Sequence, residues 1–301
     1  MPERPKSRIL ILGYGEMGHA MEHLLGPGQQ LRIWQRHPAP GTTPVSLEES
    51  VADSDFVLFC VPGSAHAELA ARIAPRLRDG ALCITIAKGL DQNARLPVES
   101  LAETLGAARV AVLYGPMIAE EIRAGKPAYA QCGAHQAPAW QRISALYAGT
   151  ALRIEAAQDV NGLSWSAILK NVYAMAFGMA DELALGDNVR GFLAVTALHE
   201  LATIVARLGS DAATPYRLAG LGDLITTATS AGSHHHELGR WIVRGATDKL
   251  QGEGIRTLAM LRAAPRFDIA RCPLFALVDD CVQNPNATRA ALQTFLDRPS
   301  S

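Results

Sequence analysis

The sequence has no excess of charge of either sign. Lysine and arginine together number 28, aspartate and glutamate number 29, and the formal net charge is −1. A chain with this balance exerts no overall electrostatic attraction on nucleic acid or on an anionic membrane surface. We therefore expect neither as a partner, and any anion that the protein binds must be held by a local site.

Paired cysteines and long apolar runs are also missing. The five cysteines are widely spaced and include no C-x-x-C pair, a pattern typical of buried, reduced thiols. Lys170 and Asn171 interrupt the longest apolar stretch, which is then too short to span a membrane. The segment before Gly13 has too few apolar residues for a signal peptide. These absences predict a cytoplasmic protein.

The first half of the chain alternates short apolar runs with helical patterns. The 301 residues are 49% hydrophobic, which is enough for two globular domains. The predicted strands read "RILIL", "LRIW", "FVLFC", "ALCITI", "VAVLY", "AYAQC" and "LRIE". Apolar strands that alternate with helices predict a mainly parallel sheet covered on both faces.

The second half has a different pattern. After about residue 159 the chain contains long, alanine-rich segments with helical periodicity, such as "SAILKNVYAMAFGMADELAL", and no convincing strand. We therefore predict an α/β Rossmann domain over residues 1–157, followed by an all-α substrate and catalytic domain over residues 158–301.

A glycine motif lies directly after the first predicted strand. In "RILILGYGEMGHAMEHLL", Gly13, Gly15 and Gly18 stand between a strand and a helix. In this setting the first glycine permits the turn, the second lets a pyrophosphate approach the backbone, and the third allows close packing of helix on strand. The motif predicts a dinucleotide site at the N-terminus of the helix.

The end of the second strand indicates which dinucleotide is bound. Enzymes that use NAD usually carry an acid there for the ribose 2′-hydroxyl. The segment after "LRIW" has no acid before Glu48, but Arg36 stands at the strand end. This pattern favours the 2′-phosphate of NADP, with NAD as the second choice, although Arg36 could also be a solvated loop charge.

Two lysines are candidates for a role in ligand binding or catalysis. Lys88 in "AKGL" follows a predicted parallel strand, at the sheet edge where open α/β sheets bind ligands. Lys170 lies on an otherwise apolar helix, so its side chain either extends to solvent or is held in a pocket by a partner. A lysine held in a pocket is a plausible proton donor to a carbonyl that is being reduced by hydride.

Taken together, the motifs resemble one known family. "GYGEMG", "AKGL", "GPMIAEE", "SAILKNVYAMAFGMADELALGDNVR", "AGLGDLITTATS" and "GEGIRT" occur in the order typical of NAD(P)-dependent glycerol-3-phosphate dehydrogenases. The resemblance implies a C-terminal domain of the type found in 6-phosphogluconate dehydrogenase. It also implies that Lys170 is the general acid and base and that Lys88 and Asp223 line its pocket. The other residues that it implies are Thr227 beside the substrate, Glu253 near the nicotinamide, and Gly115 and Ala119 in backbone contact with substrate and cofactor.

The sequence departs from the family at several candidate positions. Met117 stands where the family has serine, which removes a hydroxyl contact with the substrate, and Glu16 and Met17 replace a serine and an aromatic residue in the glycine loop. After Ser233, His234 and His235 replace an Arg-Asn pair that holds the substrate phosphate in the family.

The two histidines leave three interpretations open. Protonated imidazoles could bind phosphate more weakly than arginine does. The substrate could have changed to a less charged ketone, or the histidines could lie in an exposed, solvated loop. We expect no metal site, because adjacent residues project in different directions and no HxxxH spacing is present.

The sequence therefore predicts an oxidoreductase that transfers hydride between NADP(H) and dihydroxyacetone phosphate or sn-glycerol 3-phosphate. An alternative within the same fold is a reductase of an unphosphorylated 2-keto or 3-hydroxy acid. The alternative from another class is a dinucleotide sensor without catalytic activity, against which the presence of Lys170, Asp223 and Lys88 argues. We expect a small-molecule substrate and allow for a homodimer.

Overall fold

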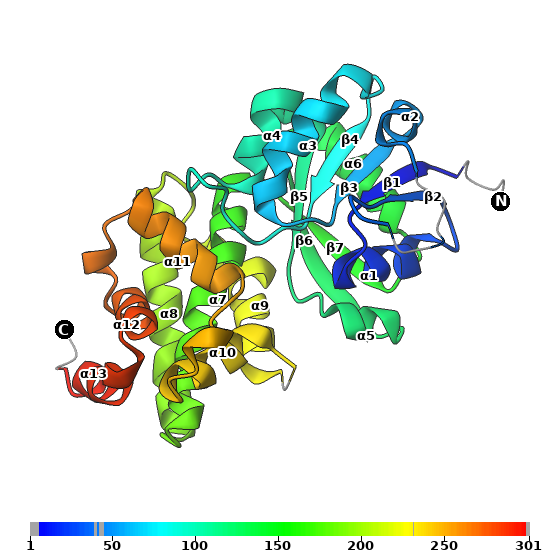
Figure 1. The fold of residues 1–301 in the computed structure, drawn as a ribbon. Helices are drawn as coiled ribbons and strands as arrows, with labels where there is room; N and C mark the ends of the chain where they lie inside the picture. The colour runs from blue at the N-terminus through cyan, green and yellow to red at the C-terminus, as the bar shows by residue number, and fades with distance from the viewer. Residues whose placement is uncertain (1–5, 39–40, 42–44, 231, 299–301) are drawn as a thin grey trace. The chain divides into compact units, whose positions relative to one another are not determined.

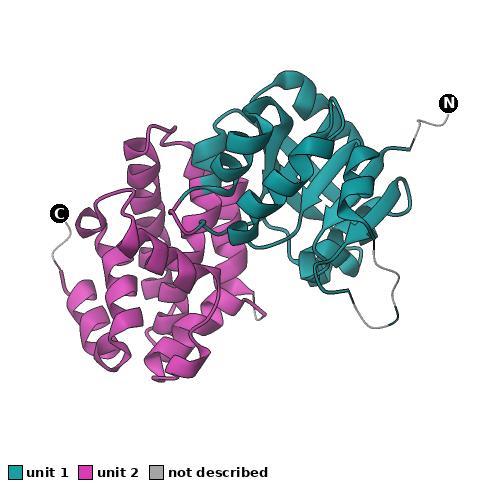
Figure 2. Cartoon of the chain, turned by 45° about the horizontal axis from the view of Figure 1, so that its top comes forward, with its two compact units in different colours: residues 1–91, 95–164 teal, residues 92–94, 165–301 magenta. Residues whose placement is uncertain are grey.

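The computed structural model describes residues 6–38, 41, 45–230 and 232–298, and it divides the chain into two compact units (Figures 1 and 2). Unit 1 comprises residues 1–91 and 95–164, and unit 2 comprises residues 92–94 and 165–301. The sequence predicts a domain boundary between residues 157 and 158, whereas the units divide after Ser164. The signal-peptide argument depends partly on residues 1–5, which lie outside the described residues.

Unit 1 contains a seven-stranded sheet in the order β2-β1-β3-β4-β5-β6-β7. The strands are β1 (Arg8–Leu12), β2 (Gln30–Trp34), β3 (Phe56–Phe59), β4 (Leu82–Thr85), β5 (Val110–Tyr114), β6 (Ala128–Ala134) and β7 (Leu152–Ala157). All neighbouring pairs are parallel except β5 and β6. Every residue of β3, β4 and β5 is buried, as expected for central strands covered on both faces. The predicted, mainly parallel sheet is confirmed.

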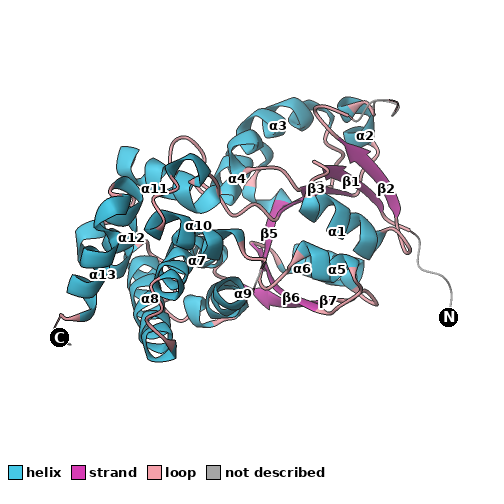
Figure 3. Ribbon diagram, turned by 60° about the horizontal axis from the view of Figure 1, so that its bottom comes forward, coloured by secondary structure: helices cyan, strands magenta, loops and turns pink. Residues whose placement is uncertain are grey.

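Helices lie on both faces of this sheet (Figure 3). One face carries α1 (Glu16–Leu25), α5 (Ala119–Arg123) and α6 (Ala137–Tyr147), and the other carries α2 (Leu47–Ala52), α3 (His66–Ile73) and α4 (Pro97–Leu105). Met21 of α1, Ile122 of α5 and Ile143 of α6 are fully buried in one core with the strands. The carboxyl ends of β1 and β4 lead into the glycine turn and Lys88, so both candidate segments lie at the same edge of the sheet.

Unit 2 is helical, as predicted. Its helices are α7 (Val160–Glu182), whose first turn belongs to unit 1, α8 (Asp187–Arg207), α9 (Asp223–Thr229), α10 (His234–Val243), α11 (Glu253–Ala263), α12 (Pro273–Gln283) and α13 (Thr288–Leu296). From Leu163 to Ala180 every residue of α7 is buried, which makes this helix the centre of the unit.

One helix of the described residues, α8, is long and apolar enough to cross a membrane by length and composition, and 39% of its most apolar window is buried inside the protein. A core helix of a soluble protein passes the same test, so this property alone does not identify a membrane span.

All five cysteines are free thiols. Burial raises the pKa of Cys60, Cys83 and Cys132 to about 12. These thiols therefore stay protonated and unreactive at neutral pH.

Candidate active site

The three glycines after β1 have the geometry that a dinucleotide turn requires. Gly13 has φ +92°, and a Cβ there would lie 2.7 Å from the carbonyl oxygen of Cys60. A Cβ on Gly18 would lie 2.4 Å from the oxygen of Gly13, so the helix can approach the turn only without a side chain. A Cβ on Gly15 would meet nothing within 4 Å, so the backbone there is open to a ligand. These features fit the pyrophosphate of a dinucleotide at the N-terminus of α1.

The acidic residue in this turn forms an ion pair with an arginine that is far away in the sequence. Glu16, the first residue of α1, accepts a hydrogen bond of 2.6 Å from Nη2 of Arg123 on α5. Without this ion pair, a carboxylate beside the pyrophosphate would repel it. Met17 packs partly buried against the core of unit 1. Arg123 lies 107 residues from Glu16, and the sequence gives no signal for the pairing.

Arg36 follows β2 as predicted, but it has an acidic partner. Its Nη2 donates a hydrogen bond of 2.6 Å to Oε2 of Glu68 on α3, and both side chains are about half exposed, at 49% and 55%. A 2′-phosphate at Arg36 must therefore compete with the carboxylate of Glu68. The sequence reasoning missed this partner.

Lys88 lies at the carboxyl edge of the sheet, where its Nζ donates a hydrogen bond of 3.3 Å to the carbonyl oxygen of Gly115 after β5. A Cβ on Gly115 would lie 2.4 Å from the oxygen of Tyr129, so the close approach of these segments requires glycine. Met117 is 7% exposed and belongs to the core, and Ala119 begins α5. The structure thus brings Lys88 and Gly115 together.

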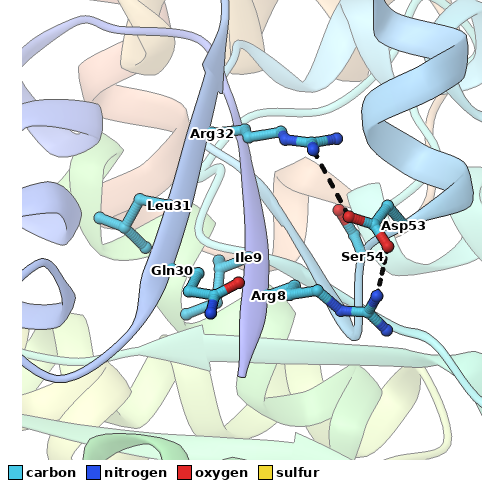
Figure 4. A pocket seen from close by; sticks show the side chains of 7 residues that line it. All are labelled: Arg8, Ile9, Gln30, Leu31, Arg32, Asp53 and Ser54. Atoms are coloured by element: carbon cyan, nitrogen blue, oxygen red, sulfur yellow. Dashed lines mark hydrogen bonds and ion pairs between the residues drawn. The ribbon is translucent and has the colours of Figure 1, made fainter. Parts of the chain in front are cut away.

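A cavity of about 240 Å³ in unit 1 lies at the opposite edge of the sheet, where the parallel strands begin (Figure 4). There Asp53 forms ion pairs with Arg8, at the start of β1, and with Arg32 of β2. This edge holds the amino ends of the parallel strands, whereas open α/β sheets bind ligands at the carboxyl ends. We interpret the Arg-Asp cluster as a structural ion-pair network.

Three candidate residues of unit 2 meet around a buried ammonium group. Lys170 is only 4% exposed, and its Nζ lies 3.2 Å from Oδ1 of Asp223. The same Nζ donates a hydrogen bond to the hydroxyl of Thr227, which in turn donates one of 2.7 Å to the carbonyl oxygen of Asp223. Of the two alternatives for Lys170, the structure selects the pocket with a partner.

The local fold places these side chains. Asp223 begins α9 directly after a π-helical turn over Leu218–Gly222. Such turns are rare and often occur at functional sites. A Cβ on Gly220 would lie 2.1 Å from the oxygen of Pro215, so glycine is required for this turn to pack. Asp223 and Thr227 are four residues apart and therefore project from one face of α9.

Asn171, next to Lys170, was not among the predicted site residues. It is 2% exposed, and its Oδ1 has no hydrogen-bond partner within the part of the chain that the structure describes. Buried amide oxygens almost always accept a hydrogen bond. The signal in the sequence was a second polar residue on an otherwise apolar helix.

The three histidines lie in the first turn of α10, and Ser233 caps this helix. Nε2 of His234 donates a hydrogen bond of 2.6 Å to the oxygen of Gln251, and Nε2 of His235 accepts one of 3.3 Å from the amide of Gly254. His236 lies 2.7 Å from the carboxylate of Asp181. The histidines therefore lie in a helix and not in a loop, although His234 is exposed.

Glu253 is the first residue of α11. Burial raises the pKa of its carboxyl group, and the nearby Arg256 opposes this shift. Because Glu253 directly precedes Gly254, the hydrogen bond from Gly254 to His235 lies beside it.

Comparison with known proteins identifies the family. The sequence-family model of the NAD-dependent glycerol-3-phosphate dehydrogenase N-terminus matches residues 42–139. The family model of the C-terminus of the same enzyme matches residues 159–293. The chain is 36% identical to a glycerol-3-phosphate dehydrogenase [NAD(P)+] from Deinococcus radiodurans, over 85% of each chain. It is 32% identical to the enzyme of that name from Gloeobacter violaceus, over 95% of this chain and 97% of the relative.

A solved structure agrees with these matches. The crystal structure of glycerol-3-phosphate dehydrogenase from Coxiella burnetii superposes with a TM-score of 0.85 at 26% identity, and the match covers 97% of this chain and 99% of that one. Both halves of the chain therefore match one and the same enzyme family. The protein belongs to the NAD-dependent glycerol-3-phosphate dehydrogenase family and is an NAD(P)-dependent oxidoreductase that acts on a CH–OH group.

Proposed function

We propose that this enzyme interconverts dihydroxyacetone phosphate and sn-glycerol 3-phosphate, with NADP(H) as its preferred cofactor and NAD(H) as the second. The observation that carries the proposal is the buried ammonium of Lys170, held 3.2 Å from the carboxylate of Asp223. Burying such a pair is costly unless each group is well partnered. A buried pair between Lys170 of α7 and Asp223 of α9 therefore indicates a chemical role.

In this proposal Lys170 moves the proton of the reaction. A bound nicotinamide would supply or take up the hydride at the carbonyl carbon of the substrate. Lys170 donates a proton from Nζ to the carbonyl oxygen as its negative charge develops, and in the reverse direction the neutral amine accepts the proton of the alcohol. Asp223 and Thr227 hold Nζ in place for both directions.

Other residues bind and orient the substrate. Asn171 has a buried oxygen that lacks a donor among the described residues, and a substrate hydroxyl would satisfy it. By resemblance to the family we also assign Lys88, Gly115, Met117, Thr227 and Ser233 to the substrate.

The cofactor residues follow from the glycine turn and from the family. We assign Gly13, Gly15, Glu16, Met17 and Gly18 to the pyrophosphate. Arg36 is assigned to the 2′-phosphate, and Ala119, Glu253 and Lys88 to the remainder of the cofactor. Support comes from the open backbone at Gly15 and from the neutralisation of Glu16 by Arg123.

The test is steady-state reduction of dihydroxyacetone phosphate by NADPH. Lys170→Met should lower kcat by about 10²- to 10⁴-fold, which is the usual contribution of a positioned acid or base, and should leave NADPH binding intact. Lys170→Arg keeps the charge beside Asp223 but cannot release a proton at neutral pH, so it should fold and be equally slow. Lys126→Met, at an exposed ion pair with Glu121, is the matched control.

Two results would contradict this proposal. Near-normal kcat in folded Lys170→Arg would remove the lysine from proton transfer. Turnover of dihydroxyacetone phosphate far below that of an unphosphorylated 2-keto acid would favour the alternative substrate.

We further propose that the enzyme works in the cytoplasm as a homodimer. Free, buried thiols suit a reducing compartment. Phe192 and Val195 of α8 expose 46% and 65% of their surface, and exposed apolar side chains of this size are common at subunit interfaces. Sedimentation equilibrium tests the oligomeric state.

A further inference from the structure

Helix α10, which carries the histidines, is docked on α7 through two glycines. A Cβ on Gly178 of α7 would lie 1.9 Å from the oxygen of His236, and a Cβ on Gly239 of α10 would lie 2.0 Å from the oxygen of Met175. Backbone contacts this close leave no freedom to slide. The first turn of α10 is therefore fixed relative to α7.

His234 holds the segment that leads into α11. A carbonyl oxygen can only accept a hydrogen bond, so Nε2 of His234 carries the hydrogen that it donates to Gln251. Gly252 has φ +138°, and a Cβ there would lie 2.7 Å from Nε2 of His234. The imidazole thus fits against a backbone that only glycine can form.

His235 holds the first turn of α11 itself. A backbone amide can only donate, so Nε2 of His235 carries a lone pair, and in this arrangement the ring is neutral with its hydrogen on Nδ1. Gly252, at the N-cap of α11, has no side chain to accept from the first amides, and His235 supplies an acceptor from another helix.

The same turn contacts α7 beside the catalytic lysine. A Cβ on Gly254 would lie 3.1 Å from Cδ2 of His235 and 3.4 Å from the carbonyl oxygen of Asn171. Gly254 therefore packs between the imidazole and the turn of α7 that carries Lys170. Glu253, the neighbour of Gly254, is placed by the same contacts.

We propose that His234 and His235 are positioning residues that hold the start of α11, and with it Glu253, against α7 beside Lys170. They stand where the family has its phosphate-binding Arg-Asn pair, and in this structure both Nε2 atoms are engaged by the backbone. In its kinetic consequences this inference rests on the proposed function, which assigns Glu253 to the cofactor.

The first test measures the imidazole hydrogens directly. In protein labelled with ¹⁵N-histidine, two-bond ¹H–¹⁵N correlation spectra at pH 7.5 should show His235 as the neutral Nδ1–H form and His234 with hydrogen on Nε2. Spectra of His234→Gln and His235→Gln assign the signals. An imidazolium or an Nε2–H form at His235 would overturn the proposal.

The second test measures the turn that the histidines hold. Hydrogen exchange of the Gly254 amide should quicken about 5- to 30-fold in His235→Ala, the scale of a lost helix cap. His235→Gln places an amide oxygen near the position of Nε2 and should restore slow exchange. His199→Ala, at an exposed position on α8, is the matched control and should change nothing. Unchanged exchange in folded His235→Ala would refute the positioning role.

Kinetics then separate positioning from phosphate binding. His235→Ala should raise the Michaelis constant for NADPH more than that for dihydroxyacetone phosphate, and His235→Gln should rescue both. A selective rise for dihydroxyacetone phosphate that glutamine does not rescue would show phosphate binding instead. If the wild-type enzyme does not reduce dihydroxyacetone phosphate at all, the proposed function fails, while the spectra and the exchange rates still decide the positioning role.

Discussion

The carboxylate of Glu68 and the 2′-phosphate of a bound NADP(H) would compete for the guanidinium group of Arg36. The ion pair with Glu68 is half exposed, and such pairs contribute only about 0–1 kcal/mol. A 2′-phosphate, which makes charge-assisted hydrogen bonds worth about 1.5–3 kcal/mol, should displace the carboxylate. We therefore expect the enzyme to bind NADPH more tightly than NADH, by a ratio that would be larger without Glu68.

Two substitutions at this ion pair should change the preference in opposite directions. Arg36→Ala should weaken NADPH binding about tenfold, the equivalent of one such hydrogen bond, and leave NADH binding unchanged. Glu68→Gln should increase the preference for NADPH by up to about fivefold. Fluorescence titration of both cofactors measures the ratio, with exposed Arg76→Ala as the control. If NADH binds as tightly as NADPH to the wild-type enzyme, Arg36 does not discriminate.

At the scale of residues, the sequence predicts the features that depend only on neighbouring residues in the chain. Gly13, Gly15 and Gly18 could be placed because their motif is set by one strand, one turn and one helix. The partners of Arg36, His234 and His235 lie 32, 17 and 19 residues away along the chain. These pairings depend on how the helices pack, and a single sequence does not contain that information.

At the scale of elements, a buried histidine joins the start of α3 to the end of β4. Nδ1 of His66 donates a hydrogen bond of 3.1 Å to the oxygen of Pro62, and the neutral ring accepts one of 2.8 Å from the hydroxyl of Thr85. Thr85 accepts from the amide of Ala87, and the hydroxyl of Tyr114 donates to the carbonyl oxygen of Ala87. The turn that presents Lys88 is thereby fixed on both sides.

This histidine should make stability depend on pH. Burial lowers the pKa of His66 to about 4, against the opposing effect of its backbone hydrogen bonds, whereas a free histidine has a pKa of about 6.5. Between these values the unfolded chain binds a proton that the folded protein does not. Stability is therefore full above about pH 6.5 and falls as the pH drops towards 4, by about 3 kcal/mol in total.

Urea unfolding at pH 7 and pH 5 measures this effect. Between pH 7 and pH 5 the free energy of unfolding of His66→Gln, which cannot titrate, should fall by about 2 kcal/mol less than that of the wild-type protein. His135→Gln, at an exposed position, should behave like the wild type. An equal loss of stability in wild type and His66→Gln would mean that His66 does not stay neutral in the fold.

The periodic helices were predictable, whereas the short ones around the site were not. The apolar repeats of "SAILKNVYAMAFGMADELAL", "RGFLAVTALHELATIVARLG", "IRTLAMLRAA" and "LFALVDDCVQ" predict helices, and α7, α8, α11 and α12 lie there. One of the three interpretations of the histidines assumes a loop, yet α10 begins at His234. The overlooked signal is Ser233, whose side chain accepts from the amide of His236 and so marks the helix start.

At the scale of the whole molecule, the helix α7 belongs to both units. Its first turn, with Val160, Leu163 and Ser164, is buried in unit 1. A Cβ on Gly133 of β6 would lie 3.0 Å from Cδ2 of Leu163, so the helix start packs directly on the sheet. The hydroxyl of Ser164 donates a hydrogen bond of 2.8 Å to the carbonyl oxygen of Val160 within this turn. The first turn of α7 is therefore part of the core of the Rossmann unit.

This arrangement predicts where the Rossmann unit can be cut. A fragment of residues 1–157 ends with β7, lacks the first turn of α7, and exposes the apolar surface that Val160 and Leu163 cover. Burying two such side chains contributes about 3–5 kcal/mol, so this fragment should be less stable than residues 1–168 by that amount. Urea unfolding of both fragments measures the difference, and Leu163→Ala in the longer fragment should remove about half of it. Equal stability of the two fragments would mean that the boundary between residues 157 and 158, expected from the sequence, is the better description of how this chain divides.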